Sequence, residues 1–379
     1  MRPDTPDRTH PLQVGDPAPW FIGRNPSNPR YDFSSVAGRP VLLSFLGSSA
    51  DAEGAALLAA IDAAAALFDD ERLCFFGVSS DPADAARLTD RIPGRRFFLD
   101  ADGAIARRYG AVDAAGRPRR LGYLLDARLR VVAVLPCPEG DAARHAAQLL
   151  QLAAALPPPE APRPALPQAP VLVLPDVFEP ALCQHLVELY RSQGGVESGF
   201  MREEGGRTVG RLDAGFKRRR DHEIADPALR RACTARIHDR LAPELLKAFQ
   251  FRATRIERHI VACYDAADRG FFRAHRDNTT AGTAHRRFAV SLFLNSGGFD
   301  GGQLRFPEYG NALYTAPLGG AVVFSCTLLH EALPVTAGQR YMFLPFLYDE
   351  AAARVRERNA GLLGEPPAAA DGGAALSGA

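Results

Sequence analysis

The chain has 379 residues, with 45 basic and 44 acidic side chains and a formal net charge of +1. Hydrophobic residues make up 46% of the chain and charged residues 23%, which is typical of globular proteins, and the length favours two domains. The near-neutral charge gives no electrostatic reason to expect a nucleic-acid or membrane-surface partner.

Six cysteines are spread along the chain without a CxxC pair. This spacing argues against a disulfide framework or a cysteine zinc site and favours a reducing compartment. The first residues are polar and proline-rich, and no apolar run approaches the roughly 18 residues that a membrane span needs. We therefore expect a cytoplasmic protein without a membrane partner.

Composition divides the chain into four segments. Residues 156–170 contain seven prolines, so we expect an extended, semi-rigid linker there. The last residues are small and polar, which predicts a largely disordered tail over 351–379. This leaves a first domain over residues 1–155 and a second over 171–350.

The first domain alternates apolar runs with helical segments. Residues 41–46 and 73–80 are continuous apolar runs, as expected for strands covered on both faces, and an alanine-rich helix former lies between them. Residues 95–100 predict a third strand, 121–135 a hairpin, and 141–156 a closing helix. This order predicts a three-layer α/β domain.

The motifs "VGDPAPWF", "VLLSFLG", "GVSSD" and "RLGYLLD" resemble those of peroxiredoxins of the AhpC/TSA type, which implies a thioredoxin-like fold. That family carries its peroxide-reducing cysteine just after the first core strand, but this chain has no cysteine between Val41 and Leu73. Arg120 matches the arginine that activates the cysteine in the family and here has nothing to activate. Cys74 lies in an apolar strand and is expected to be a core residue. We therefore predict a non-catalytic domain, which makes a thiol peroxidase the weakest functional hypothesis.

The second domain begins with a strand and a helix over residues 171–190, and an amphipathic helix is predicted over 226–249. A charged, irregular region separates the two helices. Short strands separated by Gly and Pro turns follow, which is typical of a sandwich or barrel, with the jelly roll as the common enzymatic form. The predicted strands are "RIERHIVACY", "FFRAHRD", "RFAVSLFLN", "GGQLRF", "ALYTAPLGGAVVFSC" and "QRYMFLPFLYD".

His275 and Asp277 are two residues apart at the end of a predicted strand, so their side chains should project to the same face. His330, at the end of the apolar run "GGAVVFSCTLLH", is the candidate third ligand. Two imidazoles and one carboxylate form the facial triad of non-haem Fe(II) oxygenases. Zinc is the alternative metal, and a surface pair is the alternative without a metal.

Arg340 opens the next strand, which is otherwise apolar. A buried guanidinium needs a partner, and it suits a carboxylate because it can donate two parallel hydrogen bonds. The far carboxylate of 2-oxoglutarate would supply one beside an iron site.

Together with "CYDAADRGFFRAHRD" and "GGQLRFPEYG", these residues make the second domain resemble the prolyl 4-hydroxylase-like 2-oxoglutarate/Fe(II) dioxygenases. The resemblance implies a double-stranded β-helix (jelly roll) with flanking helices, and Fe(II), 2-oxoglutarate and O₂ as cofactor and co-substrates, with ascorbate as a candidate reductant. It implies iron binding by His275, Asp277 and His330. It also implies binding of 2-oxoglutarate by Arg340 and Tyr264, with no catalytic side chain beyond the iron centre.

Several other polar residues are assigned a structural role, and for the rest the sequence does not decide between two roles. Asn278 could contact substrate or cap a turn, and Arg287 could face the pocket or the solvent. The basic loop 217–220 is read as a solvated face, with a substrate-side lid as the alternative, and "NTTAGTAHR" is a second lid candidate. Surface or structural roles are expected for His222, His259 and His285.

The leading functional hypothesis is a dioxygenase that hydroxylates an unactivated C–H of a peptidyl residue, amino acid or metabolite, releasing succinate and CO₂. The alternative is an iron-binding sensor of oxygen or 2-oxoglutarate with little turnover. Under the leading hypothesis the first domain would be a docking or dimerising module, and a homodimer is one option.

Overall fold

A computed structural model of the chain describes residues 7–162, 164 and 166–364. The chain divides into two compact units, residues 1–164 and 165–379, so the division falls within the proline-rich segment. The described residues of that segment form no helix or strand. Each unit has its own apolar core.

The N-terminal unit is built on one five-stranded sheet. Its strands are β3 (Val41–Gly47), β4 (Cys74–Ser79), β5 (Arg95–Leu99), β6 (Leu121–Leu125) and β7 (Val131–Pro136). Their order is β5-β4-β3-β6-β7, with β3, β4 and β5 parallel and the β6–β7 hairpin antiparallel. β3, β4 and β6 are buried along nearly their whole length, which is why they are apolar without alternation.

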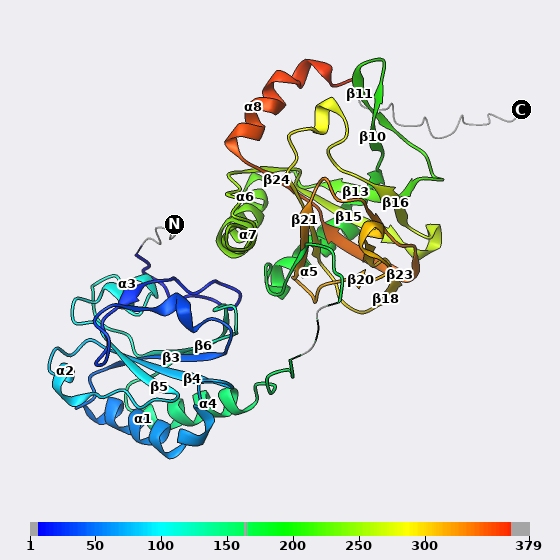
Figure 1. Ribbon diagram of the computed structural model, residues 1–379. Coiled ribbons are helices and arrows are strands. Elements are labelled where there is room, and N and C mark those ends of the chain that lie inside the picture. The colour runs from blue at the N-terminus through cyan, green and yellow to red at the C-terminus, as the bar shows by residue number, and fades with distance from the viewer. Residues whose placement is uncertain (1–6, 163, 165, 365–379) are drawn as a thin grey trace, which may run out of the picture. The chain divides into compact units, whose positions relative to one another are not determined.

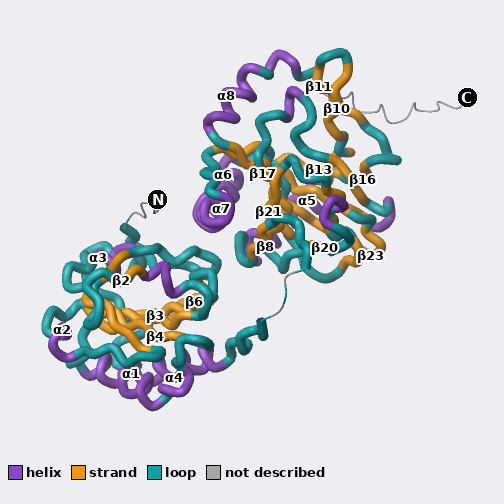
Figure 2. The backbone as a smooth tube through the Cα atoms, in the orientation of Figure 1, coloured by secondary structure: helices purple, strands orange, loops and turns teal. Residues whose placement is uncertain are grey.

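Helices and short N-terminal strands cover the two faces of this sheet. Helices α1 (Ala52–Ala63) and α4 (Ala142–Ala154) pack together on one face, as Figure 2 shows. The other face carries a second apolar cluster that includes α3 (Ala104–Arg108). The smaller elements are β1 (Ile22–Gly23), β2 (Tyr31–Asp32) and α2 (Asp84–Arg87). This is the thioredoxin-like fold that the sequence predicts.

Arg120 lies beside the start of α1, where peroxiredoxins carry their reactive cysteine. Its guanidinium forms ion pairs with Asp51 and Glu53, and its Nε donates to the carbonyl of Leu46 at 2.9 Å. Asp51 also caps α1 by accepting from the N–H of Gly54. Two carboxylates therefore take up the arginine that would otherwise stabilise a thiolate.

We predict that the protein does not consume hydrogen peroxide faster than buffer with a thiol reductant. Burial raises the pKa of Cys74 to about 12, and burial and the nearby Glu53 raise the pKa of Cys137, so both thiols stay protonated at neutral pH. A peroxide-consumption assay on the wild type and Cys137→Ser checks this. A rate that depends on Cys137 would contradict it.

The C-terminal unit contains two antiparallel sheets that face each other (Figure 1). The large sheet has the order β14-β24-β17-β23-β15-β13-β9, with β8, β18 and β21 attached, and the small sheet has the order β12-β16-β22-β19-β20. The large-sheet strands are β8 (Leu172–Leu174), β9 (Val196–Glu197), β13 (Arg220–Glu223), β14 (Arg255–Glu257), β15 (Ile260–Asp265), β17 (Phe288–Phe293), β18 (Phe299–Gly301), β21 (Ala321–Ser325), β23 (Val335–Phe343) and β24 (Phe346–Tyr348). The small-sheet strands are β12 (Lys217–Arg218), β16 (Phe271–His275), β19 (Leu304–Arg305), β20 (Leu313–Tyr314) and β22 (His330–Ala332).

One apolar cluster fills the space between the sheets, and another lies between the large sheet and three helices. These helices are α5 (Pro180–Gln193), α6 (Pro227–Arg236) and α7 (Ala242–Phe249). The predicted helix over 226–249 is a continuous helical segment with one π turn over Ile237–Leu241. Pro243 lacks the N–H that a regular α-helix would need there, which accounts for the wider turn. The unit is a double-stranded β-helix with flanking helices, as expected.

One expectation for this unit was wrong. The region between the helices is not irregular, because it forms β9, β12, β13 and a separate hairpin of β10 (Phe200–Glu204) and β11 (Arg207–Arg211). Within the segment predicted as a largely disordered tail, α8 (Glu350–Arg358) is ordered and is capped by Asp349 through the N–H of Ala352, while residues 365–379 lie outside the described residues.

The segment that follows α8 forms hydrogen bonds with β11 and with the loop before β17. The N–H of Gly364 donates to the carbonyl of Thr208 in β11 at 2.8 Å, and Asn359 Nδ2 donates to the carbonyl of Ala281 at 2.7 Å. In the part of the chain that the structure describes, no helix is long and apolar enough to cross a membrane.

Candidate metal centre

A cavity of about 760 Å³ opens between the two sheets of the C-terminal unit. The small sheet contributes Phe272, His275 and His330, the large sheet contributes Tyr264 and Ser291, and the β10–β11 hairpin adds further wall residues. The metal ligands predicted from the sequence lie in this wall.

His275, Asp277 and His330 converge in the cavity, with their ligand atoms all within 4.8 Å of one another. β16 pairs with β22 so that His275 stands directly opposite His330, although the two are far apart in the sequence. Asp277 follows the end of β16, where its N–H donates to the carbonyl of Cys326 at 3.0 Å. Among the described residues this is the only such group of three possible ligands.

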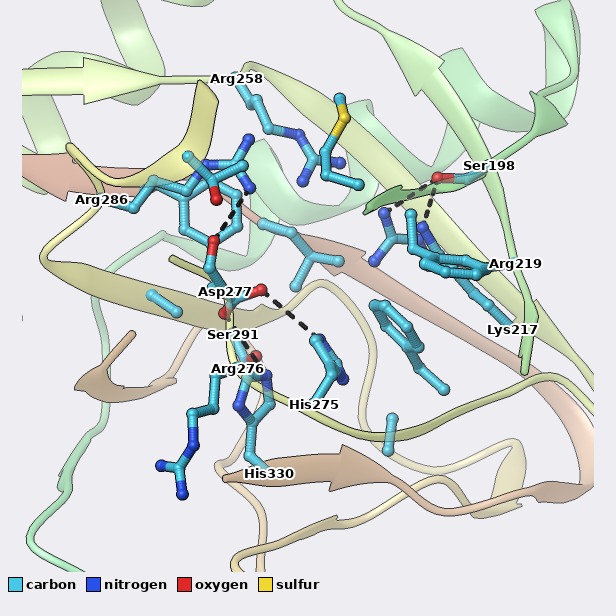
Figure 3. A pocket seen from close by; sticks show the side chains of 18 of the residues that line it. Ser198, Lys217, Arg219, Arg258, His275, Arg276, Asp277, Arg286, Ser291 and His330 are labelled. Carbon is cyan, nitrogen blue, oxygen red and sulfur yellow. Dashed lines mark hydrogen bonds and ion pairs between the residues drawn. The ribbon is translucent and has the colours of Figure 1, made fainter. Parts of the chain in front are cut away.

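Backbone carbonyls orient both imidazoles. The Nδ1 of His275 lies 2.7 Å from the carbonyl of Arg273, and the Nδ1 of His330 lies 3.0 Å from that of Leu328. The two Nε2 atoms then face Asp277, at 3.5 Å and 3.4 Å from its carboxylate oxygens (Figure 3). Hydrogen bonding of one ring nitrogen to a carbonyl leaves the other as a free lone pair, which is the usual arrangement of metal-binding histidines.

The protonation states also suit a cation. Burial lowers the pKa of His330 to about 4, so its imidazole is neutral at neutral pH. Burial alone would raise the pKa of Asp277, but the neighbouring His330 and His275 hold it below its usual value. A neutral imidazole and an ionised carboxylate are the forms that bind a metal. The donor set of two nitrogens and one oxygen therefore fits a divalent transition metal.

Arg340 and Tyr264 are neighbours on paired strands, β23 and β15. The Arg340 guanidinium lies 5.1 Å from the centre of the Tyr264 ring and 5.0 Å from that of Phe293. Arg340 is 1% exposed, and its buried Nε has no hydrogen-bond partner. Burial lowers its pKa to about 10, so it keeps its charge at neutral pH.

Tyr264 lines the cavity, whereas Arg340 lies behind it and is not part of the described cavity wall. Gly302 makes room for Arg340, because a Cβ at that position would lie 2.7 Å from the arginine Cδ. A buried arginine with an unpartnered nitrogen fits a carboxylate ligand.

The remaining candidates lie elsewhere. His285 is buried and bonded to Glu257 at 2.5 Å, His259 contacts Thr234 at 2.9 Å, and His222 contacts a carbonyl. Asn278 and Arg287 are not among the described wall residues.

Four cations near the triad were missed or placed wrongly by sequence reasoning. Residues 217–220 are not a loop but belong to β12, β13 and the residue between them, and Lys217 and Arg219 are buried in the cavity wall. Arg258 and Arg286 also line it, whereas Arg287, for which the sequence left the pocket and the solvent open, is not among the wall residues. For Lys217 and Arg219 the signal was the run of basic residues.

The fold and the arrangement of two histidines and a carboxylate define the class of the C-terminal unit as a double-stranded β-helix with a candidate metal centre. Residues 259–348 match the family model of the 2OG-Fe(II) oxygenase superfamily. The match covers the part of the chain that carries the triad, and it supports a dioxygenase-type function. No curated protein matches the chain.

Solved structures resemble each part of the chain. A prolyl hydroxylase from Trichoplax adhaerens, in complex with a hypoxia inducible factor peptide fragment, is 16% identical over 50% of this chain and 86% of its own, with a TM-score of 0.36. A Pseudomonas putida prolyl-4-hydroxylase is 19% identical over 48% and 94%, with a TM-score of 0.36. A peroxidoxin from Mycobacterium tuberculosis is 22% identical over 38% of this chain and 99% of its own, with a TM-score of 0.34.

We predict that His275→Ala lowers the affinity for Mn(II), which replaces Fe(II) here because it is stable to oxidation. Loss of a residue that only orients a metal ligand lowers metal affinity by roughly 10- to 100-fold, and the loss of a ligand itself should lower it by more. The reason is that the variant loses one of three protein ligands. Anaerobic calorimetric titration measures the affinity. His222→Ala, which removes a histidine outside the cavity, is the matched control and should bind like the wild type. Equal binding by both variants would contradict the assignment.

Proposed function

We propose that the C-terminal unit is a 2-oxoglutarate- and Fe(II)-dependent dioxygenase that hydroxylates an unactivated C–H bond. The observation that carries the proposal is the triad, in which carbonyl-bonded imidazoles turn both Nε2 atoms toward Asp277. The balanced reaction consumes the substrate, 2-oxoglutarate and O₂, and yields the hydroxylated substrate, succinate and CO₂.

In this proposal His275, Asp277 and His330 hold the iron on one face. Three protein ligands leave open positions for the co-substrate and for O₂. Bound iron supplies the oxidising chemistry that couples decarboxylation of 2-oxoglutarate to hydroxylation of the substrate.

Arg340 and Tyr264 are assigned to the far carboxylate of 2-oxoglutarate. Arg340 has the charge, the burial and the unpartnered Nε for this role, and Tyr264 is the residue between it and the cavity. For the ligand to reach the guanidinium, the Tyr264 ring has to turn aside or share the contact through its hydroxyl.

Apolar side chains around the triad keep water from the reacting centre. Phe272 stacks on the His275 ring at 3.6 Å between ring centres, and Phe324 lies 4.5 Å from the His330 ring. Such walls strengthen the electrostatic contacts of the bound co-substrate. The substrate proposed here is a peptidyl residue, an amino acid or a metabolite.

The N-terminal unit takes no part in the chemistry on this proposal. With its arginine paired to two carboxylates, it serves as a docking or dimerising module.

We expect the apoprotein to develop the weak visible charge-transfer band of a chelated complex on anaerobic addition of Fe(II) and then 2-oxoglutarate. Arg340→Ala should need at least about 30-fold more 2-oxoglutarate, because removing one partner of a buried charge pair costs roughly 2–5 kcal/mol. Tyr264→Phe should need about 5-fold more, as expected for one hydrogen bond. Titration of the band against 2-oxoglutarate gives these values.

Arg220→Ala, an exposed arginine on β13, is the matched control and should behave like the wild type. A band in the wild type that does not respond to Arg340→Ala would remove Arg340 from the site while leaving the metal assignment intact. Failure of the wild type to form a band would defeat the proposed function.

Turnover separates an enzyme from an iron-binding sensor. We expect the iron-loaded protein to form succinate from 2-oxoglutarate in air. Succinate should form faster when a pool of small molecules or peptides that contains the substrate is added, because decarboxylation of 2-oxoglutarate is coupled to hydroxylation of the substrate. Succinate is measured by mass spectrometry, with His330→Ala as the inactive control. Binding of iron and 2-oxoglutarate without succinate formation in any pool would favour the sensor.

A further inference from the structure

The cavity wall carries a cluster of four cations in addition to the triad. Lys217, Arg219, Arg258 and Arg286 come from three separate stretches of the chain and all line the cavity. Figure 3 shows Arg258 reaching into the space between Arg286 on one side and Arg219 and Lys217 on the other. We call these four residues the cation cluster.

The cation cluster has fewer carboxylate partners than cationic side chains. Arg219 forms a two-pronged ion pair with Asp221, at 2.7 Å and 2.6 Å. Arg286 forms an ion pair with Glu257 at 2.7 Å, and that carboxylate also bonds His285. Two carboxylates therefore serve four cations.

Lys217 has no carboxylate within ion-pair distance among the described residues. Its Nζ donates instead to the Ser198 hydroxyl at 2.7 Å and to the carbonyl of Gly199 at 2.6 Å. Burial and the nearby Arg219 lower the pKa of Lys217 well below its ordinary value. Even with Lys217 neutral, three guanidinium groups of the cluster share two carboxylates. The wall also contains Arg202 and Arg276 beside Asp213 and Asp277, so its basic side chains outnumber its acidic ones.

Arg258 is the least compensated of the guanidinium groups. Its one ion pair among the described residues is a 3.3 Å contact to Asp221, whose carboxylate is already engaged by Arg219 and by the Ser198 hydroxyl at 2.5 Å. Its side chain keeps 27% of its surface exposed, within the cavity.

The backbone at Arg258 is strained. Its φ is +72°, a left-handed conformation that favours glycine, and the predicted strand is interrupted here between β14 and β15. An arginine at this position gives the cavity wall a guanidinium that a glycine would not supply. Strained residues of this kind cluster where a ligand is held.

Apolar side chains line the same cavity as the cation cluster and the triad. Phe346 lies against two of its members, with the Arg286 guanidinium 4.0 Å and the Arg258 guanidinium 5.4 Å from its ring centre. A volume of about 760 Å³ is that of a small-molecule site. Other apolar wall residues are Phe200, Met201, Phe216, Leu304 and Leu344.

We propose that the cation cluster, with Arg258 as its main binding residue, holds the acidic head group of the substrate, which is a small anionic molecule with an apolar body. The head is a carboxylate or a phosphate, and the body lies between the head and the metal ligands. This inference rests on the proposed function for the identity of the bound molecule as substrate, but anion binding itself does not need iron.

The test is calorimetric titration of the full chain with three acids and their neutral counterparts. The protein is first loaded anaerobically with Mn(II) and saturating 2-oxoglutarate, so that the co-substrate site is filled before the probe is added. The pairs are hexanoate and hexanamide, N-acetylleucine and its amide, and hexyl phosphate and hexanol. The carboxylates and the phosphate differ in head group, so their ranking identifies the preferred anion.

We expect at least one acid to bind at millimolar concentration or below and at least 10-fold more tightly than its neutral counterpart. Arg258→Gln should weaken that acid by about 10- to 100-fold, as expected for a charge-assisted hydrogen bond, and Arg258→Lys should recover part of the loss. Arg218→Gln is the matched control, because Arg218 is exposed, lies in the same basic run and does not line the cavity.

Two additional variants distinguish loss of acid binding from loss of folding and from failure of the iron site. Arg258→Gly suits the left-handed backbone and removes the guanidinium, and its thermal unfolding temperature, measured beside that of the wild type, separates loss of binding from loss of folding. His275→Ala without metal should still bind the acid, so failure of the iron site does not hide the cation cluster.

The inference is overturned if no acid binds, if acids and neutral counterparts bind equally, or if Arg258→Gln leaves the affinity unchanged. It is also overturned if Arg340→Ala abolishes acid binding while Arg258→Gln does not, because the probe would then occupy the co-substrate site.

Discussion

The pairing of β16 with β22 is the constraint on which the candidate site depends. It sets His275 directly opposite His330, where antiparallel geometry brings backbones to within about 4.5–5.5 Å. A slip of one residue would turn one imidazole to the opposite face of the sheet and separate the two ligands. The N–H of Asp277 bonds the carbonyl of Cys326, and this fixes the third ligand just past the end of the strand.

Electrostatic balance distinguishes the two units. In the N-terminal unit, Asp51 and Glu53 neutralise Arg120 at the place where related folds hold a thiolate. In the C-terminal unit, the cavity wall keeps cations that its own carboxylates do not fully match. Unmatched charge near a cavity signals a ligand more strongly than charge that is internally paired. Any reactivity of this chain is therefore expected in its second half.

Much of the fold and the triad could be predicted from the sequence, because both depend on local patterns. Continuous apolar runs predicted β3 and β4, and the spacing of His275 and Asp277 at the end of a strand predicted two ligands on one side. His330 could be singled out because it ends the apolar run "GGAVVFSCTLLH", although the structure places it at the start of a separate strand, β22. These features need only the side-chain period of a strand and the chemistry of the residue types.

The rest depends on long-range contacts that a single sequence does not show. β12 and β13 are strands made of charged residues, whose burial is offset by Asp221 and by contacts from β9 and its neighbours. The basic run thus looked solvated although Lys217 and Arg219 are buried. Arg286 and Arg287 are adjacent in sequence, and the position of the following strand decides which one enters the cavity. Nothing in the sequence predicts the left-handed backbone at Arg258, because such a conformation is usually marked by a glycine.

The segment after α8 has a consequence for where the C-terminal unit can be cut. Its bonds to Thr208 and Ala281 tie the β10–β11 hairpin and the loop before β17 to the rest of the unit, and both contribute to the cavity wall. The family match ends at residue 348, before this segment begins. A protein shortened to the matched residues would keep His275, Asp277 and His330 but lose the β10–β11 hairpin and β12, which form part of the cavity wall, together with the segment after α8. Such a piece would contain the candidate metal ligands without much of the wall that faces them.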